Sequence, residues 1–263
     1  MHNHTDQIFE PSHMTDAEVD ALTDALYPAH CSVFAGVSLE EFRQYVIEPE
    51  ALRTRIEVYF GPDGRAMGYT ALHVFERTID GREMLVIRME SGLEASLRGS
   101  GISMPFSMDQ LVRCRMDFPD AELYYLGCFV SPMSYMLFSK CAPLSWPHPK
   151  FDTSDETLDL MCELADSFGL KTTADDHPLV RDVGWRLHDT DKDIERFSSS
   201  RRKEVRFYLE QNPGYTDGAG LLYLASLDWS LVQEAATAKR PTLLGSQLKN
   251  AAEHSGHGQR MAA

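Results

Sequence analysis

Hydrophobic positions change their spacing early in the chain, and each spacing predicts a different element. In DAEVDALTDALYP, residues 16–28, apolar side chains recur every three or four positions, which predicts a helix that Thr15 caps and Pro28 ends. The same spacing returns at 39–48 and predicts a second helix. In TRIEVYF, 54–60, apolar and polar residues alternate, as they do in a half-buried strand.

Two turns then fold the following strands into a meander. GPDG at 61–64 ends the first strand, and the Asp80-Gly81 pair favours the tight turn of an antiparallel hairpin. The apolar runs on either side of that pair, 66–79 and 82–91, are the second and third strands. The sequence therefore predicts three successive antiparallel strands.

A glycine-rich stretch, LRGSGIS at 97–103, follows the meander. Glycines allow a close approach of the backbone to a phosphate, and the helical pattern that comes next offers free N–H groups at its first turn. The same composition also fits an ordinary turn. Further on, the pattern predicts a strand at 121–130 and a helix that starts with the cap Ser131 and Pro132 and runs to about Lys140.

The second half of the chain predicts fewer strands than the first. A proline-rich connection leads to a helix at 155–169, and a mostly helical stretch lies between two apolar strands at 183–189 and 220–228. Because two strands are too few for a sheet of their own, we expect them to complete the sheet of the first half.

This interpretation gives one enlarged domain over residues 15–245. Its core is expected at 15–142 and its C-terminal extension at 143–245. The polar ends, 1–14 and 246–263, are expected to be flexible.

Composition restricts the classes of function. The chain has 263 residues, 43% of them hydrophobic, and a formal net charge of −15, which disfavours a nucleic-acid partner. Its five cysteines form no CxxC pair, and the later histidines have no metal-ligand spacing. His2 and His4 could bind a metal but fit a flexible polar terminus better, so we expect reduced thiols and no metal. We find no signal peptide and no segment long and apolar enough to cross a bilayer, and therefore expect a soluble cytoplasmic protein.

Two motifs resemble those of the GNAT superfamily of acyl-CoA N-acyltransferases, over roughly residues 15–142. The family's pyrophosphate loop reads Q/R-x-x-G-x-G/A, and Arg98, Gly101 and Ser103 fall on it. A second family pattern lies on the next strand and helix. It is matched by Ser131, Ser134, Leu137, Phe138 and Lys140.

The resemblance implies a mixed α/β fold with αβα layers, in which an antiparallel meander is followed by a βαβα unit. It implies an N-acyltransferase that moves an acyl group from a thioester, either acyl-CoA or acyl-phosphopantetheine on an acyl carrier protein, to an amine of a small molecule or protein. The long second half suggests an enlarged variant similar to N-acyl amino acid or acyl-homoserine lactone synthases. The alternative is a catalytically inactive GNAT-like binding or interaction protein, because Phe138 replaces the family's usual proton-donating Tyr.

Candidate site residues follow from these positions. For the acyl donor we expect a phosphate-binding loop. It comprises Arg98, Gly99, Ser100, Gly101, Ile102 and Ser103. Glu90, at a strand end, is the first candidate for the base that deprotonates the amine, although it also fits an exposed glutamate paired with Arg88. Tyr135 is a candidate proton donor or a core residue, and either Tyr124 or Tyr125 should line the substrate site.

Two further features leave alternatives open. SRRKEVR, 200–206, is the densest basic cluster and is either a solvated helix face or a dock for a phosphate of coenzyme A or for an acyl carrier protein. His73 has no evident partner and is interpreted as a structural histidine, and Cys128 as a small buried hydrophobe.

Overall fold

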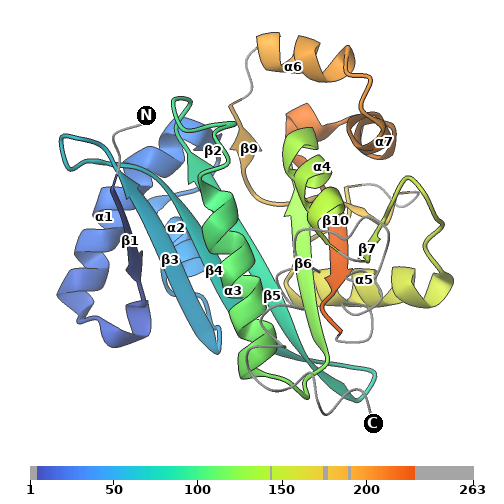
Figure 1. Cartoon of the computed structure of the whole chain (residues 1–263), viewed down its shortest axis with the longest axis horizontal. Helices are drawn as coiled ribbons and strands as arrows, with labels where there is room; N and C mark the ends of the chain where they lie inside the picture. The colour runs from blue at the N-terminus through green and yellow to red at the C-terminus, as the bar shows by residue number, and fades with distance from the viewer. Residues whose placement is uncertain (1–4, 143, 174–176, 189–190, 229–263) are drawn as a thin grey trace.

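The structure is a computed structural model and describes residues 5–142, 144–173, 177–188 and 191–228. Its main sheet has eight strands in the order β1-β3-β4-β5-β6-β10-β7, with β8 also paired to β10 (Figure 1). The strands are β1 (Thr5–Phe9), β2 (Phe34–Ala35), β3 (Arg53–Phe60), β4 (Ala66–Ile79), β5 (Arg82–Leu93), β6 (Leu123–Phe129), β7 (Ser145–Trp146), β8 (Val180–Asp182), β9 (Arg186–Leu187) and β10 (Ala219–Ser226). The α-helices are α1 (Asp16–Val33), α2 (Leu39–Phe42), α3 (Ser103–Asp117), α4 (Pro132–Cys141), α5 (Asp155–Ser167), α6 (Asp191–Ser198) and α7 (Lys203–Gln211).

The first helix starts where the sequence predicts and ends later. The Thr15 hydroxyl accepts from the Glu18 N–H while the Glu18 carboxylate accepts from the Thr15 N–H, which is a capping box. The predicted stop at Pro28 is wrong, because α1 continues to Val33. The turn beyond the proline buries His30 and Val33 against the rest of the molecule, and this packing outweighs the hydrogen bond that proline cannot make.

The predicted meander is confirmed. β3, β4 and β5 pair antiparallel, and the hairpin between β4 and β5 turns at Asp80 and Gly81, both with positive φ (49° and 74°). The tight turn fixes a register that places His73 opposite Arg88.

The N-terminal segment differs from the expected flexible end. Residues Thr5–Phe9 form β1, which pairs antiparallel with β3, so that Phe9 lies opposite Ile56. β1 thereby supplies partners to backbone groups on the outer edge of β3 that would otherwise face water unpaired. The expected C-terminal tail at 246–263 lies outside the described residues.

The central strands β5 and β6 are parallel, and they separate after a short paired stretch. Leu85–Ile87 pairs with Leu123–Tyr125, whereas residues 88–93 of β5 and 126–129 of β6 do not pair with each other within the described part of the chain. We call these two carboxyl-terminal halves, which do not pair with each other, the splay. It leaves backbone polar groups of both strands without a sheet partner on their facing sides.

Helices cover both faces of the sheet. The face that holds Ala71 and Val86 packs against α1, α2 and α5, and the face that holds Leu72 and Ile87 packs against α3, α4 and α7 (Figure 1). The three layers, and the order of meander, loop, helix, parallel strand and helix, agree with the mixed α/β fold with αβα layers that the sequence predicts. The predicted fold class is confirmed.

The second half of the chain extends the same sheet. β10 pairs antiparallel with β6, as expected for the strand predicted at 220–228. The strand predicted at 183–189 does not join this sheet, because β9 pairs with β2 in a separate two-stranded sheet. The helices predicted between these strands are present as α6 and α7.

None of the helices in the described ranges is long and apolar enough to span a bilayer.

Candidate functional site

The predicted phosphate loop connects β5 to α3 at the carboxyl end of the splay. Gly99 and Gly101 both have positive φ (75° and 78°), and a Cβ at either position would meet no atom within 4 Å. Among the described residues, the N–H groups of Gly99, Gly101 and Ser103 donate to no protein acceptor. The loop therefore presents open backbone donors beside the first turn of α3, which is the arrangement an anion requires.

Two side chains of this loop stabilise the loop itself. Arg98 Nε donates to the Leu93 carbonyl at 3.0 Å, which fixes the arginine against the end of β5. Ser100 Oγ donates to the Leu97 carbonyl at 2.6 Å and accepts from the Ile102 N–H at 3.3 Å. The open backbone N–H groups of the loop remain available to a ligand.

Glu90 lies on the splay half of β5, on the face covered by α1, α2 and α5. Only 12% of its side chain is exposed. Its Oε2 lies 3.0 Å from His73 Nε2, and its Oε1 lies 3.7 Å from Arg88 Nη2. Burial raises the pKa of Glu90, but the charges of His73 and Arg88 outweigh burial and hold that pKa below its ordinary value. Glu90 is therefore an ionised, nearly enclosed carboxylate.

His73 is the residue that sequence reasoning missed at this site. Its side chain is 1% exposed, and its Nδ1 lies 3.0 Å from Thr54 Oγ1 on β3 while its Nε2 faces Glu90. The signal was present in the hairpin, because the two-residue turn pairs Ala71 with Glu90 and so makes His73 the diagonal neighbour of Glu90 on the same face. The predicted pairing of Glu90 with Arg88 is present in the structure.

Two arginines meet at one aromatic ring on the same face. The guanidinium carbons of Arg77 and Arg88 lie 4.0 Å and 4.9 Å from the centroid of the Phe168 ring, which follows α5. Arg77 also donates from Nε to Ser167 Oγ at 3.2 Å. Burial lowers the pKa of Arg77, and the like charge of Arg88 lowers it further. The arrangement concentrates positive charge next to Glu90.

The two predicted substrate tyrosines point to opposite faces, as expected for neighbours on a strand. Tyr125 is 2% exposed and stacks on Phe138, with ring centroids 4.9 Å apart and 17° between the planes. Burial raises its pKa well above the ordinary value. Phe138 therefore packs in the core formed by α4 and the sheet.

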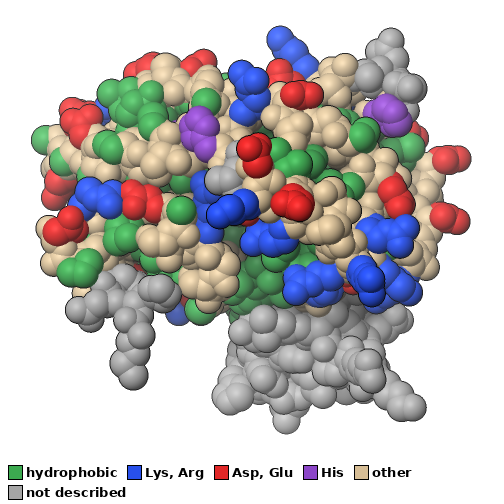
Figure 2. Space-filling view, turned by 90° about the horizontal axis from the view of Figure 1, so that it is seen from above, with side chains coloured by type: hydrophobic (Ala, Val, Ile, Leu, Met, Phe, Trp, Pro, Cys, Tyr) green, Lys and Arg blue, Asp and Glu red, His purple; other side chains and the backbone are tan. Residues whose placement is uncertain are grey.

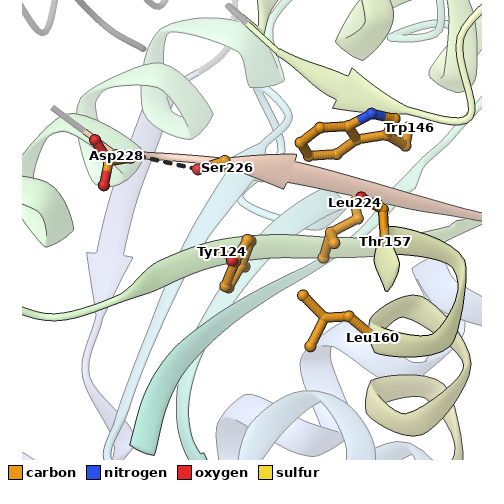
Figure 3. A pocket seen from close by; sticks show the side chains of 7 residues that line it. All are labelled: Tyr124, Trp146, Thr157, Leu160, Leu224, Ser226 and Asp228. Atoms are coloured by element: carbon orange, nitrogen blue, oxygen red, sulfur yellow. Dashed lines mark hydrogen bonds between the residues drawn. The ribbon is translucent and has the colours of Figure 1, made fainter. Parts of the chain in front are cut away.

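Tyr124 lies below the splay, opposite Val86, and lines a pocket of about 320 Å³ between α5 and the β6–β10 pair (Figure 3). The other residues that line this pocket are Trp146, Thr157, Leu160, Leu224, Ser226 and Asp228. The Tyr124 hydroxyl donates to Glu122 at 2.9 Å. The structure thus does not bring Tyr124 together with Glu90, which lies on the splay half of β5.

Tyr135 is fully buried in α4. Its hydroxyl donates to the carbonyl of Pro147 at 2.8 Å, and its ring stacks on Phe207 with centroids 5.8 Å apart. This is the environment of a core tyrosine with a satisfied hydroxyl, which is one of the two roles that the sequence leaves open.

The basic cluster lies at the start of α7. Arg201, Arg202 and Lys203 are exposed, and Arg202 Nη1 contacts Met136 Sδ of α4 at 3.4 Å. Figure 2 looks onto the end of the sheet at which β5 and β6 terminate, and Lys and Arg side chains gather on one side of that face. Contact with α4 places the cluster near the helix that follows β6.

In the described ranges, neither Cys128 nor a cluster of metal-ligating side chains provides a further candidate site. Burial raises the pKa of Cys128 to about 12, so its thiol is protonated at neutral pH. No group of three or more His, Cys, Asp or Glu side chains in the described part of the chain could hold a metal ion.

Several solved structures are similar to this chain. A GCN5-related N-acetyltransferase from Kribbella flavida is 12% identical, with 84% of this chain and 98% of that chain covered and a TM-score of 0.36. Escherichia coli ElaA is 15% identical, with 51% and 85% covered and a TM-score of 0.33. Arabidopsis thaliana NAA60 in complex with acetyl-CoA is 14% identical, with 51% and 81% covered and a TM-score of 0.35. No family model matches the chain, and no curated protein matches its sequence.

Proposed function

We propose that this chain is an N-acyltransferase that moves an acyl group from a thioester, carried by coenzyme A or by the phosphopantetheine of a carrier protein, to an amine. The observation that carries the proposal is a buried, ionised Glu90 on the splay, a short distance along the chain from a loop with open N–H groups. A base, a carbonyl-polarising edge and an anion site are the parts that this reaction needs.

The loop would bind the phosphate of the acyl donor, and the splay would bind its thioester carbonyl. N–H groups of Gly99, Gly101 and Ser103 would hold the donor's phosphate. Leu85 N–H donates to the carbonyl of Glu122, the residue before β6, so odd positions of β5 direct their N–H groups toward β6. Met89 is also an odd position of β5, so its N–H points into the splay, where it would polarise the thioester carbonyl.

The transfer itself balances with these groups. The nitrogen lone pair attacks the carbonyl carbon and forms the C–N bond, and a proton from that nitrogen passes to the Glu90 carboxylate. The C–S bond then breaks, and the sulfur leaves with the electron pair and takes up a proton from solvent to give the thiol, while the Glu90 carboxyl returns its proton to solvent. Because a thiol has a pKa of about 8.5, the thiolate is a good leaving group, and a phenol at position 138 is not essential.

The experiment compares two carboxylate variants from one strand. Purified protein is incubated with acetyl-CoA and longer acyl-CoAs and a panel of amines, and products are identified by mass spectrometry. Glu90→Gln should lower kcat/KM by roughly 100-fold or more, because general-base catalysis typically contributes that much. Glu83→Gln, at the exposed opposite end of β5, is the matched control and should leave turnover unchanged.

Other results would separate the alternatives. Thioester binding by titration calorimetry without turnover of any amine favours the catalytically inactive binding protein. Turnover that Glu90→Gln leaves intact shows that the base is another group. If no thioester binds or reacts, the proposed function is wrong.

A further inference from the structure

Positive charge exceeds negative charge around Glu90. On this face of β4 and β5, Arg77 and Arg88 share the Phe168 ring, and His73 adds a third basic group. Glu90 is the carboxylate that pairs with this group, with Arg88 at 3.7 Å and His73 at 3.0 Å. In a chain of net charge −15, two arginines on one aromatic ring, of which Arg88 pairs with Glu90, are an unusual local arrangement.

Within the described ranges, the Arg88 guanidinium has no hydrogen-bond acceptor. Only 19% of the side chain is exposed, yet none of its N–H groups makes a hydrogen bond to the described part of the chain, since its separation from Glu90 is longer than one. Arg77 differs, because its Nη1 donates to the Glu76 carbonyl at 2.8 Å and its Nε to Ser167. A largely buried guanidinium with unused donors is costly unless a ligand accepts from it.

We propose that the acceptor is an α-amino acid, whose carboxylate binds the Arg88 guanidinium, with Arg77 adding charge, while its amine faces Glu90. This inference rests on the proposed function and names its substrate class. The planar guanidinium of an arginine matches the geometry of a carboxylate. The guanidinium groups of Arg77 and Arg88 also both pack on the Phe168 ring by cation–π contacts.

The spacing of the two groups suits this ligand. Arg88 and Glu90 are two positions apart on β5, so both side chains lie on one face and their charged ends are 3.7 Å apart. In an α-amino acid only the α-carbon separates amine from carboxylate. The amine can therefore contact Glu90 while the carboxylate contacts Arg88, and the ligand would replace the weak direct attraction between these two side chains.

The donor's phosphate is a less suitable occupant of this position. The open N–H groups at 99–103 lie past the end of β5, beyond Leu93. Arg88, in contrast, is the first residue of β5 after the part that pairs with β6. A phosphate at the loop and a carboxylate at Arg88 would place the two substrates at opposite ends of the splay. Glu90 lies between them along the strand.

The test uses matched acceptors and matched variants. Several L-amino acids are compared with their primary amides, which keep the amine and side chain but lack the carboxylate. The wild-type kcat/KM for the acid should exceed that for the amide by roughly 10- to 100-fold, as expected for loss of charged hydrogen bonds. Arg88→Met should reduce this ratio to about one, Arg88→Lys should retain part of it, and Arg82→Met, at the exposed end of β5, should leave it unchanged.

A binding measurement keeps this inference separate from the proposed function. In titrations without donor, the amino acid should bind wild type and not Arg88→Met, and the amide should bind neither. Such binding without turnover would uphold the carboxylate site and count against the acyltransferase. Equal turnover of acid and amide by the wild type would overturn the inference while the acyltransferase stands. Acetate or inorganic phosphate binding as tightly as the amino acid would also overturn it, because the site would then accept any anion.

Discussion

The phosphate loop can be tested with one substitution, Gly101→Val, and a control that carries the same backbone strain. Gly101 has φ +78° and open space around its missing Cβ. Gly81, in the hairpin at the opposite end of the sheet, has φ +74° and is equally open. An L-residue in this region costs about 1–2 kcal/mol, and valine at either site should therefore lower the free energy of unfolding by a similar amount.

Thioester binding should distinguish the two variants. A valine at 101 would turn the backbone away from its left-handed conformation and remove at least one N–H donor to a charged phosphate. One such hydrogen bond contributes about 2 kcal/mol, which corresponds to a roughly 30-fold weaker Kd. Gly81→Val should bind acetyl-CoA like the wild type.

The measurements are urea denaturation for stability and isothermal titration with acetyl-CoA and coenzyme A for binding. Equal affinities of Gly101→Val, Gly81→Val and wild type would refute the reasoning, and the loop would be an ordinary turn. Unfolding of Gly101→Val alone would also refute it, since the structure shows no clash that could cause a larger loss of stability than in the control.

Three further predictions concern stability. Thr15→Ala removes the capping box with Glu18 and should cost about 1 kcal/mol in urea denaturation, without effect on thioester affinity. Tyr135→Phe should cost about 1–2 kcal/mol, because the Pro147 carbonyl loses its donor, and should leave kcat unchanged; a fall in kcat without loss of stability would indicate the proton-donor role. Burial lowers the pKa of His30 to about 4, whereas a histidine in the unfolded chain has a pKa of about 6.5. Between these two pH values the unfolded state binds more protons than the folded state. The free energy of unfolding is therefore highest above pH 6.5 and falls as the pH is lowered. The loss from pH 7 to 5 should be about 2 kcal/mol in urea titrations, and His30→Gln should flatten it.

Local patterns in the sequence predict most of the elements. Alternation identifies β3 to β5, and the Asp80-Gly81 pair identifies the hairpin, because both signals depend on residues close together in the chain. The failures have tertiary causes. α1 continues past Pro28 because its last turn is buried by distant segments, and β1 forms because β3 offers an unpaired edge. Neither effect can be read from the segment itself.

The candidate site shows the same division. The position of Glu90 beside the splay follows from the order of strands. Its partners depend on distant segments, because His73 comes from β4 and Arg88 packs on Phe168 from the second half of the chain. Side-chain identity also gave no means to choose between Tyr124 and Tyr125, because both faces of β6 are covered by helices. The structure places one in a pocket under α5 and the other in the core.

The hairpin register connects the local prediction to the chemistry proposed for the site. Because side chains alternate along a strand, the two-residue turn at 80–81 sends His73, Arg88 and Glu90 to one face of the sheet. A register shifted by one residue would move Arg88 and Glu90 to the face covered by α3, beside Leu72 and Val74 of β4, and would move Ile87 off that face. Two charged groups buried there without partners would destabilise the fold, so the apolar alternation that stabilises β5 also specifies which side of the splay carries the proposed base. The position of the proposed base therefore depends on a register that is set by a turn at the opposite end of the sheet.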